Sequence, residues 1–197
     1  MTYTTKDGII ENPMWNDLIG YLAGKNIDVT SGRIDYSYPN GAVAFQNNAR
    51  YADEPVVVRH QIHHGFYFGS GAVARPHLHW LQQHSTNIPN WLFGYRLVEN
   101  GDSATIETDF SNFTFSVPQS HVFTYSSGVL AQITKFTEID ISDLSPSDFI
   151  ITVLFRDTTN ASTLFSDVDP SSLVEYATDL DLHLKIDALG SREEYTK

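Results

Sequence analysis

Apolar and polar residues alternate with a period of two through most of the chain from Val56 onward. Trp91, Phe93, Tyr95 and Leu97 occupy every second position of one run, and a later run has Leu or Ile at 180, 182, 184 and 186. Because side chains of a strand point alternately to opposite faces, such runs predict strands that each cover one side of a core. Two facing sheets satisfy this pattern, so the sequence predicts an all-β fold of the β-sandwich or jelly-roll type.

Turn residues separate these runs and give about seven or eight strands. The clearest runs are 56–68, 73–83, 90–98, 111–117, 129–141, 149–156 and 179–186. The run 149–155 is apolar on both faces, which fits a central strand or a strand whose outer face meets another subunit, and we favour the second interpretation. Acidic residues gather in the predicted turns, where we interpret them as solvated turn residues: Asp140, Asp143, Asp148, Asp167 and Asp169.

The N-terminal region carries the one convincing helix signal. Asn12 and Pro13 suit the N-cap and first helical position, and Gly24 can end the helix. Apolar residues recur between them at helical spacing: Met14, Trp15, Leu18, Ile19 and Leu22. Residues 25–55 are rich in turn formers and predict an extended segment. We therefore expect a short helix and extended arm over 1–55, packed on a β-sandwich domain over 56–197, within a single structural domain.

Composition excludes several classes of partner and site. With 197 residues the chain fits one domain, and its 12 basic and 24 acidic residues give a net charge of −12. That charge repels phosphate backbones and anionic lipid, so neither nucleic acid nor a membrane surface is an expected partner. The absence of cysteine excludes disulfides, thiolate metal sites and a cysteine nucleophile. The sequence has no signal-peptide pattern and no apolar run long enough to span a bilayer. We therefore expect neither a cleaved signal peptide nor a transmembrane helix.

The segment Arg75-Pro-His-Leu-His-Trp80 is the most concentrated candidate site. Period-two geometry sends His77 and His79 to one face and Leu78 and Trp80 to the other. Neutral imidazoles bind zinc, iron and nickel, so we predict that His77 and His79 are metal ligands. In an alternative structural role, the two imidazoles pair with backbone carbonyls, carboxylates or aromatic faces.

Two histidines supply only half of a tetrahedral shell. A site within one chain needs His84, His121 or a carboxylate brought close by the fold. A symmetric trimer offers another route, because one His-x-His from each chain at the three-fold axis gives six nitrogens. Further histidines lie nearby in sequence at His60, His63 and His64.

Gly71, followed by five residues and His77-Leu-His79, resembles the first half of the cupin metal motif, whose β-barrel houses oxygenases and isomerases. The chain departs from that motif at residues 81–84, where Leu-Gln-Gln-His stands in place of the expected Glu. Other catalytic signatures are missing, so we expect no enzyme and no catalytic residue, with a cupin-like metalloenzyme as an alternative. The Tyr and Trp side chains leave a carbohydrate-binding protein as a further alternative.

Several motifs resemble a family of small proteins encoded in the structural modules of tailed bacteriophages. They are Pro-His-Leu-His-Trp at 76–80, the aromatic run 91–99, the run 149–156 and the C-terminal stretch 179–197, with its Asp-x-His, Asp-x-x-Gly-Ser and Glu-x-x-Lys pattern. Trp15-Asn16-Asp17-Leu18 is similar to the family's N-terminal Trp-Asp-Asp-Leu, with Asn16 departing. The resemblance covers the predicted helix and most of the chain beyond residue 55.

This resemblance implies a bacteriophage virion structural protein, most simply a capsid decoration (cement) protein that stabilises the particle through subunit contacts. A head-fibre or tail-associated host-adhesion protein is the alternative. The implied location is the virion, assembled in the bacterial host cytoplasm, and the implied partners are copies of the chain in a homotrimer and the major capsid or other virion proteins. Trp80, Trp91, His183 and Arg192 are the expected structural or interface residues. No cofactor is expected, apart from iron, zinc or nickel at His77 and His79.

Overall fold

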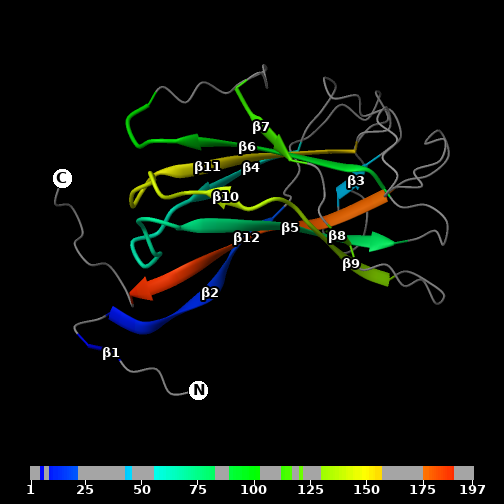
Figure 1. Ribbon diagram of the computed structural model, residues 1–197. Coiled ribbons are helices and arrows are strands. Elements are labelled where there is room, and N and C mark those ends of the chain that lie inside the picture. The colour runs from blue at the N-terminus through cyan, green and yellow to red at the C-terminus, as the bar shows by residue number, and fades with distance from the viewer. Residues whose placement is uncertain are drawn as a thin grey trace.

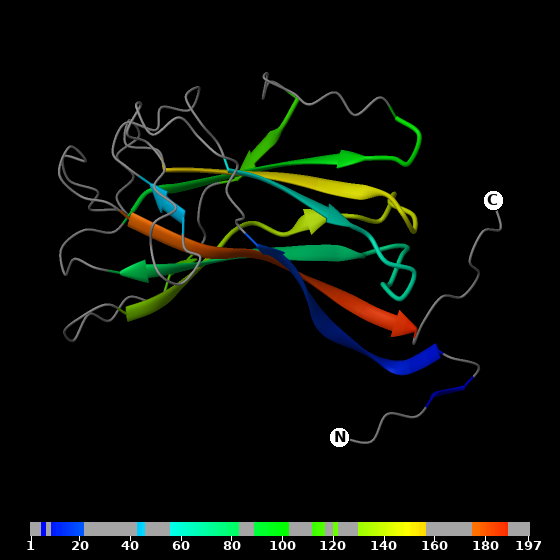
Figure 2. The same cartoon turned by 180° about the vertical axis from the view of Figure 1, so that it is seen from behind.

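The computed structural model describes residues 5–6, 9–21, 43–45, 56–82, 89–102, 112–116, 120–121, 130–156 and 175–188. Its regular elements, over these ranges, are all β-strands (Figures 1 and 2). They are β1 Thr5–Lys6, β2 Ile9–Tyr21, β3 Val43–Phe45, β4 Val56–Gln61, β5 Val73–Gln82, β6 Trp91–Val98, β7 Thr114–Ser116, β8 Ser120–His121, β9 Leu130–Lys135, β10 Ile139–Asp140, β11 Phe149–Arg156 and β12 Glu175–Ala188.

The strands form two antiparallel sheets. The larger sheet has the order β1-β2-β12-β5-β9-β8, with β3 added on β12 and β10 on β5. The smaller sheet has the order β4-β11-β6-β7. The prediction of an all-β chain with two facing sheets is therefore confirmed in these residues, and the arrangement is sandwich-like.

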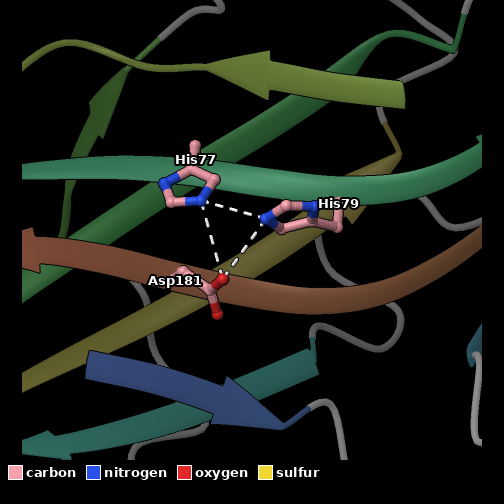
Figure 3. Close-up of side chains that lie close together, drawn as sticks. All are labelled: His77, His79 and Asp181. Carbon is pink, nitrogen blue, oxygen red and sulfur yellow. Dashed lines mark hydrogen bonds and ion pairs between the residues drawn. The ribbon is translucent and has the colours of Figure 1, made fainter. Parts of the chain in front are cut away.

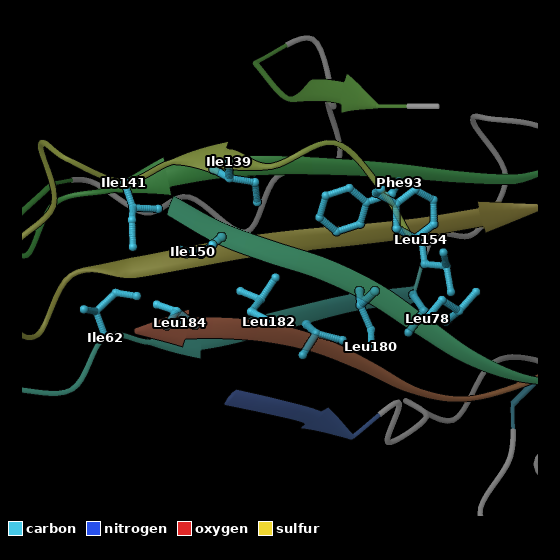
Figure 4. Close-up of a cluster of buried hydrophobic side chains, with 14 of the residues drawn as sticks. Ile62, Leu78, Phe93, Ile139, Ile141, Ile150, Leu154, Leu180, Leu182 and Leu184 are labelled. Atoms are coloured by element: carbon cyan, nitrogen blue, oxygen red, sulfur yellow. The ribbon is translucent and has the colours of Figure 1, made fainter. Parts of the chain in front are cut away.

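Apolar side chains from both sheets meet between them and form the core (Figure 4). Leu180, Leu182 and Leu184 of β12 are fully buried, as the alternation in this strand predicts. Phe93 of β6 and Leu154 of β11 meet them from the smaller sheet and are equally buried. Each such side chain contributes roughly 1.5–3 kcal/mol through burial, so the alternating pattern itself holds the two sheets together.

The predicted N-terminal helix is wrong, because residues 9–21 form strand β2. Residues four apart, such as Met14 and Leu18, share a face in a strand as well as in a helix, so the spacing satisfied both structures. Strand β12 pairs with β2 from Met14 to Tyr21 and supplies the partners that decide between them. Pro13 falls where this register shifts, a position at which a strand tolerates proline. Apart from β3, the predicted extended segment 25–55 lies outside the described residues.

Strand β11 is a central strand, since it pairs with β4 on one side and with β6 on the other. Its core-facing side chains are buried, and so are Ile151, Val153 and Phe155 on the opposite face. Phe115 of β7 covers part of that face, with its ring 6.2 Å from the Phe155 ring. The central-strand interpretation is therefore confirmed. A subunit contact is not needed to explain the apolar run.

Candidate metal centre

Three side chains converge on the outer face of the larger sheet (Figure 3). His77 and His79 of β5 bring their Nε2 atoms to 3.0 Å from each other. Asp181 of β12 places Oδ2 3.5 Å from His77 Nε2 and 3.3 Å from His79 Nε2. One nitrogen from each imidazole and one carboxylate oxygen thus form a compact triangle.

Alternation along the two strands creates this cluster. In β5, Leu78 and Trp80 enter the core, which turns the two histidines to the other face, as the sequence predicted. In β12, Leu180 and Leu182 enter the core and turn Asp181 outward. The antiparallel register then places Asp181 directly opposite the first histidine of the pair.

The cluster is largely screened from solvent although it lies on the outer face. His77 and Asp181 are only 7% and 6% exposed, whereas the His79 side chain is 35% exposed. Burial lowers the pKa of His77 to about 4, and the neighbouring charges of His183 and His79 act in the same direction. Burial raises the pKa of Asp181, against the opposing attraction of His79. At neutral pH, His77 is therefore an uncharged imidazole, the form that binds metals.

Asp181 has an incomplete set of hydrogen bonds. Its Oδ2 faces the two histidines, but its Oδ1 is buried and has no hydrogen-bond partner among the residues that the structure describes. Buried polar atoms without partners are rare in folded proteins, because each costs its full desolvation free energy. The carboxylate is therefore the least satisfied group of the cluster.

Further charged groups surround the cluster on the same sheet face. The His183 ring lies 4.2 Å from the His77 ring, and its Nε2 is 2.5 Å from Asp17 Oδ1 of β2. Arg75 of β5 lies opposite His183 in the strand pairing. Its guanidinium lies 4.0 Å from the ring centroid of Trp15, and its Nε is 2.6 Å from a Glu138 carboxylate oxygen. These contacts tie β2, β12 and β5 together beside the cluster.

The two tryptophans that were predicted to be structural or interface residues both lie in the core. Trp80 is 1% exposed, and its Nε1 donates a hydrogen bond to Thr134 Oγ1 at 3.0 Å. Trp91 is fully buried, and its ring centroid lies 6.3 Å from that of Trp80 in an edge-to-face arrangement. Both join the sheets within the chain, and neither is exposed for an external contact.

The remaining sequence candidates do not join the cluster in the described part of the chain. His60 lies in the core, where its Nε2 is 3.1 Å from Thr152 Oγ1. His63 lies after β4, with its ring 5.8 Å from that of Phe66. Three candidates lie outside the described residues or have undescribed side chains: His84, His121 and Arg192.

Asp181, the third member of the cluster, was not among the residues predicted from the sequence. Its signal is the alternating Asp-Leu-Asp-Leu-His of residues 179–183, which places Asp181 and His183 on the polar face of one strand. That pattern does not reveal which strand lies beside it. The pairing of β12 with β5 joins positions about a hundred residues apart in sequence.

A scan of protein-family models found no match to the chain, and a search of the curated proteins likewise found none. Among the described residues, no helix is long and apolar enough to cross a membrane.

Proposed function

We propose that the chain is a jelly-roll structural protein of a bacteriophage virion, acting as a capsid decoration protein that stabilises the particle through subunit contacts. The strand pairing is the observation that supports it best. Among eight principal strands the first pairs with the last (β2 with β12), the second with the seventh (β4 with β11), the third with the sixth (β5 with β9) and the fourth with the fifth (β6 with β7). Nested pairing of this kind is expected of a jelly roll, a fold found among viral capsid proteins, lectins and cupins, and it supports that part of the proposal.

The phage resemblance of the sequence selects among these three classes. Its Pro-His-x-His-Trp segment forms the middle of β5, and its Asp-x-His pattern lies in the adjacent strand β12. The two most distinctive motifs thus occupy neighbouring strands at the centre of the larger sheet. From that position both motifs contribute to the architecture of one sheet and to its outer surface.

The cupin alternative receives less support from the geometry. The cupin resemblance implies chemistry housed within the β-barrel, whereas His77 and His79 lie on the outer face of the sheet. On the inner side, apolar side chains such as Leu78 and Phe93 pack between the two sheets. A metal at the histidine pair would therefore lie on a surface rather than inside the fold.

Carbohydrate binding has no specific observation in its favour. Trp15 of β2 is the tryptophan nearest to solvent among those described, but Arg75 and Lys185 already lie over its ring at 4.0 and 5.4 Å. A sugar would have to displace these cations in order to stack on it.

Self-association is the part of the proposal that the purified protein can test. Ile19 of β2 and Ile133 of β9 stay 47% and 41% exposed on the outer face of the larger sheet, and Val57 of β4 stays 52% exposed on the smaller one. Size-exclusion chromatography with light scattering should give a homotrimer of three times the chain mass of 22.1 kDa. A monomer at micromolar concentration would contradict the proposed assembly through contacts between copies.

A further inference from the structure

We infer that one divalent transition-metal ion binds within a single chain, held by His77 Nε2, His79 Nε2 and the Asp181 carboxylate, and that it fastens β5 to β12. The ion belongs to the class that prefers mixed nitrogen and oxygen ligands, with Zn²⁺ and Fe²⁺ as the leading members. This inference concerns the sheet face alone and does not depend on the proposed virion role.

The distances between the three ligand atoms fit a common metal ion. With metal–ligand bonds of about 2.1 Å, neighbouring ligand atoms lie roughly 3.0 Å apart in octahedral geometry and roughly 3.4 Å apart in tetrahedral geometry. The observed separations are 3.0, 3.3 and 3.5 Å. These separations match those of three ligand atoms bound to a single ion.

The buried carboxylate gives independent support. Asp181 is 6% exposed, yet its Oδ1 has no hydrogen-bond partner in the described part of the chain. A bound cation supplies the missing charge for a carboxylate that is otherwise costly to bury.

The ligand set also distinguishes among ions. Two imidazole nitrogens and one carboxylate form the arrangement known from non-haem iron sites and from catalytic zinc sites. Calcium and magnesium prefer shells made of oxygen atoms, which this cluster does not provide. A ring hydrogen bond from His77 to the Arg75 backbone orients the imidazole, as is usual for a metal-binding histidine.

Burial favours a site within one chain over a site at a trimer axis. A shared axial site requires both histidines of each His-x-His to project from the surface toward other copies. His77 is only 7% exposed, and its Nε2 faces His79 and Asp181 of its own chain. Of the three alternatives predicted for a further ligand, His84, His121 or a carboxylate, β12 supplies the carboxylate.

The three ligands leave coordination positions open on the side of His79, the most exposed member of the cluster. No fourth His, Asp or Glu ligand joins the group among the described residues. Water completes such a shell, as in open zinc and iron sites. The protein-held part of the shell then connects two adjacent strands, so the ion stabilises the folded sheet.

Titration of the full chain with a metal tests the inference. Protein freed of metal with a chelator is titrated with Zn²⁺ in a calorimeter and with Co²⁺ while its visible absorption is recorded. The wild type should bind one ion per chain, and Zn²⁺ should raise its thermal unfolding midpoint by several degrees. His79→Gln and Asp181→Asn should each weaken Zn²⁺ binding at least tenfold and remove the thermal shift. His63→Ala, which removes an exposed histidine outside the cluster, should behave like the wild type.

Several results would overturn the inference. They are the absence of saturable binding, one ion per three chains, and unchanged affinity in both ligand variants. An equal loss in His63→Ala would indicate non-specific histidine binding and would also contradict the site. Melting curves recorded in chelator establish which variants are folded. His79→Gln keeps the test decisive if Asp181→Asn fails to fold, because position 79 is partly exposed.

Discussion

At the scale of single residues, the most informative side chains are polar groups that the fold buries. His60 of β4 faces the core, with its Nε2 beside the Thr152 hydroxyl, which in turn donates a hydrogen bond to the Val58 carbonyl at 3.3 Å. Burial lowers the pKa of His60 to about 4, against the opposing effect of a hydrogen bond to the Leu18 backbone. The folded chain therefore keeps this imidazole neutral in weak acid.

This burial predicts a loss of stability in mild acid. Between pH 6.5 and about 4 the unfolded chain protonates His60 and the folded chain does not, so the free energy of unfolding falls as pH decreases through this window. Over the whole window the loss from this residue is roughly 3 kcal/mol, at 1.36 kcal/mol for each pKa unit. Urea unfolding of wild type and His60→Gln at pH 7, 5.5 and 4.5 measures it. The variant should lose less stability, and equal pH dependence in the two proteins would contradict the assignment.

Asp148 is a second buried polar residue. The sequence predicted a solvated turn position, but the residue is 5% exposed and its carboxylate accepts hydrogen bonds from the N–H groups of Asn100 and Ser145, both at 2.7 Å. Asp148→Ala leaves both donors without this partner and should lower the free energy of unfolding by roughly 1–3 kcal/mol for each.

The matched control is Asp140→Ala. Asp140 is the exposed last residue of β10, and its Oδ1 accepts a hydrogen bond from the Ser142 N–H at 2.9 Å. It should change stability by about 0.5 kcal/mol or less, as surface substitutions commonly do. If the two variants have the same denaturation midpoint, the Asp148 contacts do not support this turn.

At the scale of elements, the smaller sheet depends on a glycine in strand β6. A Cβ at Gly94 would lie 2.6 Å from Phe115 Cε1 and 2.8 Å from Val153 Cγ2, so Phe115 of β7 occupies the space that a side chain would need. Gly94→Ala should lower the free energy of unfolding by about 1–3 kcal/mol through overpacking.

A double-mutant cycle checks this cause. Adding Phe115→Leu to Gly94→Ala makes room for the new methyl group, so the double variant should be more stable than the two separate losses predict. Purely additive losses would mean that the alanine destabilises the strand by another route.

The strands were predictable where local pattern decides the structure. β6 and β11 coincide closely with the predicted runs, and β12 contains the run 179–186 but begins four residues earlier, at Glu175. Alternation or a continuous apolar run is a property of the strand itself, so it can be recognised in the sequence. β2 was not predictable, because the apolar spacing of residues 14–22 suits a helix and a strand equally. Its structure depends on pairing with β12, which is a tertiary contact.

The candidate site likewise combines residues that the local pattern predicts with a residue that depends on tertiary pairing. His77 and His79 were predictable because one strand places both on one face. Asp181 was not, since its position beside them depends on the register between β5 and β12. A ligand set drawn from two strands can be recognised in sequence only in part.

At the scale of the whole molecule, net charge limits how copies can associate. Each chain carries a net charge of −12, so neighbouring copies repel one another through long-range electrostatics. Contacts between copies must therefore come from apolar burial and short-range hydrogen bonds, and physiological salt should favour assembly by screening the repulsion.

Protein mass spectrometry of gradient-purified phage particles is the most direct test of the proposed role. Particles from an infection that produces this chain should contain it in many copies, in a fixed ratio to the major capsid protein, and should retain it through the gradient. A chain that remains in the lysate while the particles band without it would contradict the proposal that it is a virion structural protein.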